Sequence, residues 1–193
     1  MHSLVGADAP SACLVGIVEG KTMISKKLEK AVNEQINKEL YSEYLYLSMA
    51  AFFEAQNLDG FGNWFHVQTQ EEHFHAMKFY RYVIDRGGEI ELDALGKPEK
   101  DFGAPVKAFE AALAHEQFIT KSIGELMDLA IKENDHSLKS FLQWYVDEQV
   151  EEEANAEKLI AKLKLIGKDG NGILNLDKEL MLRVFVPPVA AAV

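Results

Sequence analysis

The stretch QEEHFH, residues 70–75, lies in the middle of a long segment whose apolar residues recur at helical spacing. Glu72 and His75 within it are three residues apart, and on a helix this spacing puts both side chains on one face. A carboxylate beside an imidazole suits iron, manganese or zinc better than calcium or magnesium. A single Glu-x-x-His motif is common on surface helices, so it indicates a metal site only if other segments supply matching ligands.

The composition of the 193-residue chain favours one domain with a substantial core, because 48% of its residues are apolar. The net charge of −11 argues against nucleic-acid and anionic membrane partners and fits a protein that attracts cations. Cys13 is the only cysteine, which excludes an intrachain disulfide and thiolate-held metal sites and fits a cytoplasmic location. No run of about 18 apolar residues is present, so no membrane-spanning segment is expected.

Helical periodicity predicts an all-α chain with four long helices and no strands. The expected helices span residues 25–54, 61–85, 106–133 and 138–166. Short turns after the first and third helices indicate two antiparallel hairpins, whereas the connection over 88–106 is long enough to cross the length of a bundle. The sequence therefore predicts a four-helix bundle with one long crossover.

The two ends of the chain differ from this helical region. Residues 1–22 are small and apolar without helical periodicity, and we expect an N-terminal extension that is mostly disordered. The helical domain is expected over 23–184, with a turn at 169–172 and a short fifth helix over 177–184 that is ended by two prolines. An apolar tail, residues 185–193, follows.

An internal repeat supplies the matching ligands that the Glu-x-x-His motif needs if it is to indicate a metal site. A constant offset of 77 residues relates two sets of candidate ligands, which are Glu39, Glu72 and His75 in the first half and Glu116, Gln149 and Glu152 in the second. In each set the first two residues lie at the same height on their hairpin, so both hairpins can aim polar side chains at one point in the core. Buried carboxylates are costly to ionise alone. Four carboxylates and an imidazole facing one another therefore predict a site for cations.

Oxygen and nitrogen ligands of this kind bind Fe²⁺ and Fe³⁺. Glu72 is central enough to be shared between two irons. Glu39 and His75 would complete one iron site, and Glu116 and Glu152 would complete the other. The neutral amide of the second set is a weaker ligand, and we expect it to orient water or a neighbouring carboxylate.

The segments around these residues resemble the non-haem prokaryotic ferritins, over about residues 24–182. The resemblance is carried by NKELY (37–41), QEEHFHAM (70–77), HEQ (115–117) and FLQWYVDEQVEEE (141–153). It implies a ferritin-like fold and a homo-oligomeric cage of about 24 subunits. Such a cage oxidises Fe²⁺ with dioxygen or hydrogen peroxide at a di-iron centre and stores the product as a ferric mineral.

The resemblance also assigns roles to individual residues. It implies a third, weaker iron site at Glu71, Glu148, Glu151 and Glu152, with Gln149 beside the second iron.

Three further side chains near the centre follow from the same resemblance. Tyr46 matches the family's tyrosine near the di-iron centre, and Trp144 matches a nearby tryptophan; both are candidate electron donors, although Trp144 is equally well explained as a core aromatic. His73 stands where the haem-containing bacterioferritins have a haem-binding methionine. Because the second half lacks their Glu-x-x-His motif, no haem is expected, and His73 is predicted to be exposed or to lie at an interface.

Three other functions remain open from the sequence. A rubrerythrin-like di-iron peroxidase without mineral storage would use the same ligands, although such proteins usually carry an iron–thiolate domain with paired cysteines. A metal-free structural bundle would leave the ligand repeat unexplained. A small DNA-protecting cage places its ligands between subunits and would leave Glu116 and Glu152 without a role.

Overall fold

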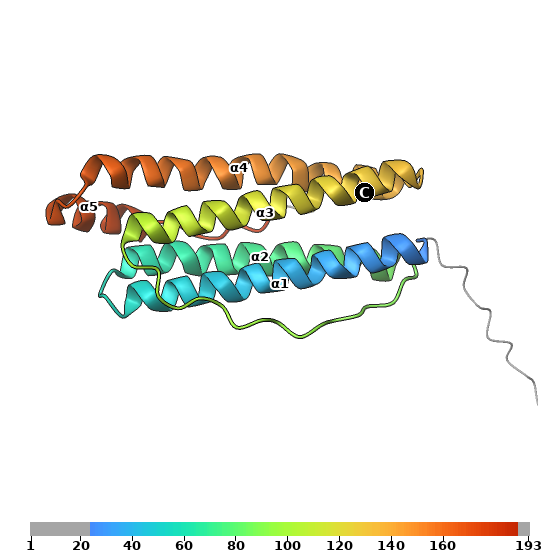
Figure 1. Cartoon of the computed structure of the whole chain (residues 1–193), viewed down its shortest axis with the longest axis horizontal. Coiled ribbons are helices and arrows are strands. Elements are labelled where there is room, and N and C mark those ends of the chain that lie inside the picture. The colour runs from blue at the N-terminus through green and yellow to red at the C-terminus, as the bar shows by residue number, and fades with distance from the viewer. Residues whose placement is uncertain (1–23, 189–193) are drawn as a thin grey trace, which may run out of the picture.

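The computed structural model describes residues 24–188, and this range contains five helices and no strand. The helices are α1 (Lys26–Glu54), α2 (Asp59–Asp85), α3 (Pro105–Lys132), α4 (His136–Ile166) and α5 (Gly170–Leu180). The first four lie side by side as two antiparallel hairpins, α1 with α2 and α3 with α4 (Figure 1). The predicted all-α bundle with one crossover and a short fifth helix is confirmed, whereas the division of the chain into extension, domain and tail stays a prediction.

The ends of the long helices lie within two residues of their predicted positions. Ser25 caps α1, because its hydroxyl oxygen accepts a hydrogen bond from the amide of Leu28 at 3.3 Å. Asp135 does the same for α4, which therefore begins at His136 rather than at the predicted Leu138. No helix in the described range is long and apolar enough to cross a membrane.

The same turn geometry closes both hairpins and extends the internal repeat beyond the ligands. Asn57 in the first turn and Asn134 in the second have positive φ values of 57° and 55°, and they are 77 residues apart. The amide after each asparagine donates to a carbonyl five residues earlier, at 3.1 Å in the first turn and 2.9 Å in the second. Asparagine tolerates this left-handed conformation at a helix end better than most residues do.

The start of α5 differs from the prediction. The glycine-rich segment over 169–172, expected to be a turn, is the first turn of α5, and the helix ends at Leu180 rather than near residue 184. The carboxylate of Asp169 accepts hydrogen bonds from the amides of Asn171 and Gly172 at 3.1 and 3.2 Å, which compensates for the poor helix propensity of the glycines. The predicted range of 177–184 was therefore wrong, and the two prolines lie beyond the end of the helix.

The position of α5 is fixed by the start of α2. Leu58 provides no side-chain cap for α2, and Asp177 of α5 supplies it instead by accepting hydrogen bonds from the amides of Gly60 and Phe61 at 2.8 and 3.0 Å. A Cβ atom on Gly60 would lie 1.7 Å from the carbonyl oxygen of Asp177, so only glycine permits this contact.

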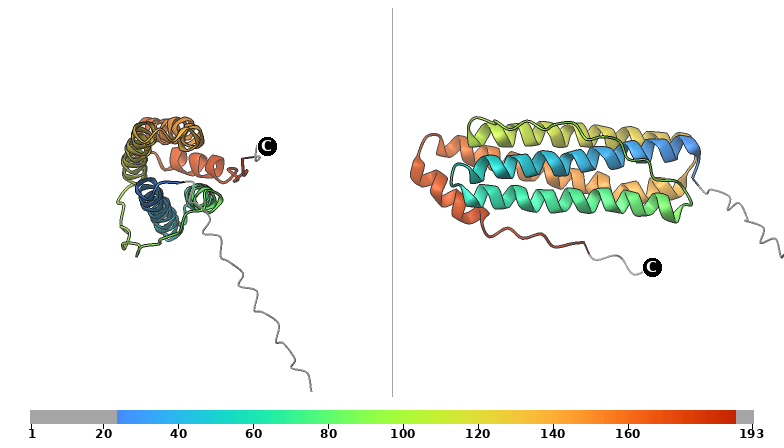
Figure 2. Two further views of the ribbon diagram at one scale, coloured as in Figure 1. Left: turned by 90° about the vertical axis from the view of Figure 1, so that its right-hand side faces the viewer. Right: turned by 90° about the horizontal axis from the view of Figure 1, so that it is seen from below.

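The segment after α5 turns back along the bundle (Figure 2). Asn63 of α2 donates hydrogen bonds to the carbonyl oxygens of Leu180 and Arg183 at 3.1 and 3.0 Å. Further along, the ring of Phe185 lies 6.3 Å from the ring of Phe74 on α2. This part of the predicted apolar tail therefore covers α2, whereas residues 189–193 and the predicted N-terminal extension lie outside the described range.

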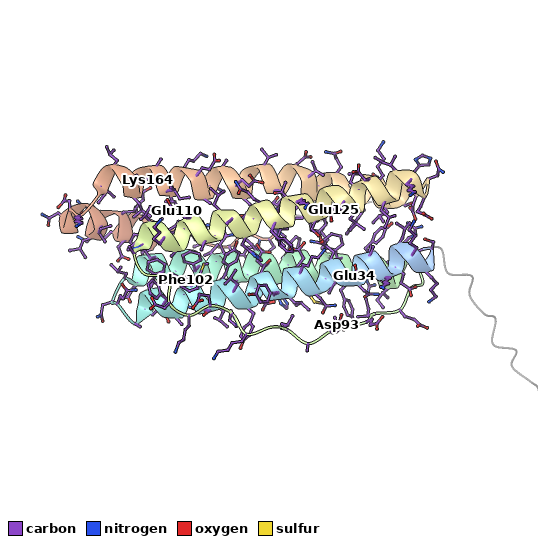
Figure 3. The ribbon with its side chains drawn as sticks, viewed as in Figure 1. Glu34, Asp93, Phe102, Glu110, Glu125 and Lys164 are labelled. Atoms are coloured by element: carbon purple, nitrogen blue, oxygen red, sulfur yellow. The ribbon has the colours of Figure 1, made fainter. Side chains whose placement is uncertain are left out.

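The long connection between α2 and α3 runs beside α1 and carries Asp93 and Phe102 (Figure 3). Two asparagines of α1 hold it. Asn33 donates to the carbonyl of residue 89 at 2.9 Å and accepts from the amide of residue 91 at 3.1 Å. Asn37 donates to the carbonyl of residue 91 at 3.3 Å and accepts from the amide of residue 93 at 3.0 Å. The side-chain amides thus pair with the connection much as a neighbouring strand would.

The apolar core is divided along the bundle axis into two clusters. The cluster near α5 is rich in aromatic rings, among them Phe53, Phe61, Trp64, Phe65 and Phe109. The cluster at the other end contains mostly aliphatic side chains of all four long helices together with Phe79 and Tyr145. In every long helix the predicted ligands lie between the stretches that build these two clusters, so the core contains a polar layer near its middle.

Candidate metal centre

The polar layer holds six predicted ligands contributed by all four long helices. They are Glu39 from α1, Glu72 and His75 from α2, Glu116 from α3, and Gln149 and Glu152 from α4. Each is only 1–4% exposed. Burying so many ionisable groups is unfavourable unless they are paired with protons or cations.

The first hairpin forms a compact cluster of three possible ligands. Glu39, Glu72 and His75 each offer one ligand atom, and these atoms lie within 4.8 Å of one another. The Oε2 atom of Glu39 and the Oε1 atom of Glu72 are buried without a hydrogen-bond partner. A buried carboxylate oxygen without a partner is destabilising. These oxygens therefore fit a bound cation that would supply the missing interaction.

The carboxylates of the second hairpin accept hydrogen bonds, from Tyr46 and Gln68 of the first hairpin as well as from Gln149 of their own. Tyr46 donates from its hydroxyl group to Oε1 of Glu116, and Gln149 donates from Nε2 to Oε2 of the same carboxylate at 3.0 Å. Gln68 of α2 donates to Oε2 of Glu152 at 2.9 Å. A cation bound by Glu116 and Glu152 would have to displace some of these donors.

A second cluster of possible ligands differs from the predicted second iron site. It combines His75, Glu148 and Glu152, whose ligand atoms again lie within 4.8 Å of one another. The Nε2 atom of His75 is 4.0 Å from Oε1 of Glu148. The structure thus brings two of the predicted third-site residues, Glu148 and Glu152, next to a ligand of the first cluster.

The other two predicted third-site residues are placed differently. Glu71 forms an ion pair with Arg183, whose guanidinium nitrogen lies 2.5 Å from Oε2 of Glu71, and Glu151 is exposed. Arg183 also donates to the carbonyl oxygen of Trp64 at 3.1 Å. The position of Arg183 beside Glu71 was not predicted from the sequence, because nothing in the local pattern shows that the segment after α5 returns to α2.

Burial strongly perturbs the ionisation of the cluster. Burial raises the pKa of Glu39 to about 7, although a hydrogen bond from Gln35 opposes the shift. Burial, reinforced by repulsion from Glu116, raises the pKa of Glu72 and of Glu152 well above the usual range. Burial lowers the pKa of His75 to about 3, so its imidazole is neutral at pH 7 and able to bind a metal. The carboxylates, by contrast, favour protonation until a cation replaces the proton.

The aromatic side chains near the centre have contrasting surroundings. Tyr46 donates to a carboxylate, which is able to accept its proton. Trp144 lies 5.4 Å from the ring of His75, and the ammonium group of Lys78 is 3.2 Å from the centroid of the Trp144 ring. His73 points elsewhere: it is exposed, with Nδ1 3.1 Å from Oε2 of Glu43.

A family description matches most of the chain. The family model of the ferritin-like domain matches residues 29–166. Among curated proteins, a bacterial non-heme ferritin of Staphylococcus aureus (strain MRSA252) is 40% identical over 163 residues, which cover 84% of this chain and 98% of the relative. A bacterial non-heme ferritin of Staphylococcus saprophyticus is 42% identical over the same shares of the two chains.

The solved structures that resemble this chain are also ferritins. A form of the Archaeoglobus fulgidus ferritin closed by site-directed mutagenesis has a TM-score of 0.84 and 51% identity, covering 84% of this chain and 99% of its own. The structure described as a novel open-pore ferritin from the same archaeon has a TM-score of 0.83 and 50% identity, with the same coverage.

Proposed function

This chain belongs to the ferritin family, and we propose that it is an iron-storage protein that oxidises Fe²⁺ at the buried centre between its two hairpins. The oxidised iron is deposited as a ferric mineral inside a cage built from copies of the chain. The electron acceptor is dioxygen or hydrogen peroxide. The cytoplasmic location expected from the sequence stays a prediction.

One observation carries this proposal most directly. Glu39 and Glu72 keep a buried oxygen without a hydrogen-bond partner beside the neutral imidazole of His75. A carboxylate layer that served only stability would be filled with donors, as the second hairpin is. Oxygen and nitrogen donors in this ratio suit iron, and two carboxylates with one imidazole leave positions for an oxidant.

In the proposed reaction iron is the substrate. Glu39 and His75 would hold one Fe²⁺ ion and Glu116 and Glu152 the other, with Glu72 between them. Each Fe²⁺ loses one electron, and dioxygen takes up two electrons and two protons to become hydrogen peroxide. Negative carboxylates stabilise Fe³⁺ more than Fe²⁺, so the ligands favour the oxidised product. Gln149 would release Glu116 when the second ion binds, and Glu148 would take part in a weaker third site together with Glu71 and Glu151.

Assembly into a cage of about 24 subunits is part of the proposal. The isolated subunit leaves large apolar side chains on its surface, including Leu165, Leu182 and Val150, which are 90%, 79% and 70% exposed. Exposed apolar residues on this scale are typical of surfaces that are covered in an oligomer.

The test is aerobic addition of Fe²⁺ to metal-free protein, with the wild type compared with Glu72→Ala. Absorbance measures oxidation, and size-exclusion chromatography then shows whether the iron stays with a large soluble particle. Glu34→Ala is a matched control, because Glu34 is an exposed carboxylate on α1. Rapid oxidation that is lost only in Glu72→Ala, with iron retained in the particle, is expected.

Two results would contradict the proposal. Equal slow oxidation in all three proteins, with precipitated iron, would show that the centre does not work as a ferroxidase. Rapid peroxide-dependent oxidation without retained iron would instead favour the rubrerythrin-like peroxidase.

A further inference from the structure

A chain of three hydrogen bonds leads from the edge of the bundle to Glu39. The ammonium group of Lys38 donates to the hydroxyl oxygen of Ser122 at 2.6 Å. Ser122 donates to the amide oxygen of Gln35 at 2.6 Å, and Gln35 donates from Nε2 to Oε1 of Glu39 at 2.8 Å. Gln35 and Ser122 are buried, whereas Lys38 is partly exposed. None of these three residues is among the predicted ligands.

The two charged groups at the ends of this series of hydrogen bonds, Lys38 and the carboxylate of Glu39, together determine the direction of each bond. An ammonium group only donates hydrogen bonds, so the oxygen of Ser122 must accept from Lys38. The hydroxyl hydrogen of Ser122 is then free for the amide oxygen of Gln35. With its oxygen engaged there, Gln35 presents its NH₂ group to Glu39. A flipped amide would place its carbonyl oxygen against the carboxylate, so the hydrogen bond to Glu39 would be lost, and Ser122 could no longer donate to Gln35.

The two oxygens of Glu39 therefore differ. Oε1 is occupied by Gln35, whereas Oε2 is buried without a partner in the cluster with Glu72 and His75. We infer that Lys38, Ser122 and Gln35 are positioning residues that reserve one defined oxygen of Glu39 for the cation of the first site. This inference rests on the proposed function, because it assumes that the cluster binds a metal ion.

The internal repeat predicts that this series of hydrogen bonds affects metal binding at the first site only. The positions that correspond to Gln35 and Lys38 in the second hairpin are Ala112 and His115. The Nε2 atom of His115 lies 2.7 Å from the hydroxyl oxygen of Ser42, but Ala112 has no side-chain amide to donate a hydrogen bond to Glu116. Glu116 is instead held by Tyr46 and Gln149. Disrupting the chain should therefore weaken the first site and leave the second unchanged.

The test is an anaerobic calorimetric titration of the metal-free full-length protein with Co²⁺, which binds oxygen and nitrogen ligands without being oxidised. The binding event that Glu39→Gln removes identifies the first site. Residues that hydrogen-bond to metal ligands typically contribute about 10–100-fold to affinity. We expect Gln35→Leu to lower the Co²⁺ affinity of this site by about 10–100-fold, and Ser122→Ala by about 10-fold. Ser122→Thr, which keeps the hydroxyl group, should restore the affinity to within about threefold.

Two controls separate positioning from general damage. Ser42→Ala removes another buried serine, whose hydroxyl group contacts the backbone carbonyl of Lys38 and the ring of His115 but is not one of the hydrogen bonds that lead to Glu39, and it should leave the first-site affinity unchanged. Lys38→Met changes a partly exposed residue without altering the core, and it should weaken the first site by about threefold even if Ser122→Ala folds poorly. Thermal unfolding of each metal-free variant reports any loss of fold.

The outcomes are distinct. Wild-type Co²⁺ affinity in Ser122→Ala and Gln35→Leu, or equal weakening of both sites, would overturn the positioning role while leaving the centre itself intact. A wild-type protein that shows no event sensitive to Glu39→Gln would overturn the proposed function, and the inference with it.

Discussion

The two hairpins of the bundle are related by a repeat of 77 residues, yet they hold their carboxylates differently. In the first hairpin, Glu39 and Glu72 each keep an oxygen without a hydrogen-bond partner. In the second, both oxygens of Glu116 accept hydrogen bonds, and the position that corresponds to Glu72 is occupied by Gln149. In the first hairpin a proton or a cation must therefore supply the missing interaction, whereas neighbouring side chains already supply it in the second.

This difference shows how similar positions can bind the same ion with unequal strength. Binding to the first hairpin removes an unfavourable burial, whereas binding to the second must also replace existing hydrogen bonds. Under the proposed function, the first iron is held more tightly and the second binds in a step that is easier to reverse. Reversible binding on one side suits a centre whose product moves on to a mineral core.

The largest effect is expected when the first hairpin receives the residue that the second hairpin has at the corresponding position, glutamine in place of Glu72. Glu72→Gln keeps the size of the side chain but removes the shared carboxylate. We expect the rate of Fe²⁺ oxidation to fall by at least about 100-fold, since losing a ligand should cost more than losing a residue that merely supports one. Stopped-flow absorbance measures the rate, and a loss of less than about threefold would show that Glu72 is not shared between two ions.

A second prediction concerns the stability of the metal-free protein between pH 4.5 and 7. Burial raises the pKa of Glu39 from 4.5 to about 7, so over this range the unfolded state loses its proton before the folded state does, and the contribution of Glu39 to stability falls as pH rises. Relative to Glu39→Gln, we expect the wild type to lose about 3 kcal/mol per subunit between pH 4.5 and 7 and to change little above pH 7. His75 and His115 have pKa values lowered to about 3 and 4 and act in the opposite direction below about pH 6.5, but both are present in the two proteins, so the difference between the proteins isolates Glu39.

Thermal unfolding in metal-free buffers across this range checks the prediction. Glu39→Gln cannot ionise at this position, so its stability should rise relative to that of the wild type as pH increases. A stability difference between the two proteins that does not change with pH would mean that the pKa of Glu39 is not raised in the folded state.

The reverse substitution, Gln149→Glu in the second hairpin, tests the same difference and should have a smaller effect. Gln149→Glu gives the second hairpin the carboxylate of the first and removes the donor to Glu116. We expect the second site to bind Co²⁺ about 10-fold more tightly and the metal-free protein to be less stable. Calorimetry measures both sites in one experiment. An unchanged second-site affinity would indicate that hydrogen bonds from Gln149 do not limit binding there.

The smallest effect is expected at Trp144. The ammonium group of Lys78 lies 3.2 Å from the centre of this ring and disfavours the loss of an electron from it, whereas Tyr46 has Glu116 as a proton acceptor. Trp144→Phe should change the rate of Fe²⁺ oxidation by less than about threefold, and Tyr46→Phe should slow it by about 10-fold. Rapid-freeze electron paramagnetic resonance would identify the radical, and a tryptophan signal would contradict this assignment.

Much of the fold could be predicted because it depends on local patterns. Apolar periodicity located four helices to within two residues, and sequence spacing placed Glu39 level with Glu72 on one hairpin and Glu116 level with Gln149 on the other. These features follow from helix geometry alone. The start of α5 was missed because Asp169 overrides the low helix propensity of the glycines that follow it.

The support of the centre could not be predicted in the same way. Ser122 and Gln35 are 87 residues apart, and their contact depends on how α1 and α3 are rotated against each other. The pairing of Arg183 with Glu71 depends on the path of the chain after α5. Neither relation leaves a periodic signal, because a single polar residue on a helix looks the same whether or not a distant partner faces it.

Two asparagines can hold the long connection against α1 because one turn of α-helix is nearly as long as two residues of extended chain. Asn33 and Asn37 are separated by one turn of α-helix, a rise of about 6 Å, and the two amides that they bind are two residues apart in an extended chain, a rise of about 6.6 Å. The mismatch of about 0.6 Å is small for two rungs but grows with each further turn. This connection is therefore pinned in register over a short stretch, and deleting one residue between 89 and 93 would turn the paired amides away from α1.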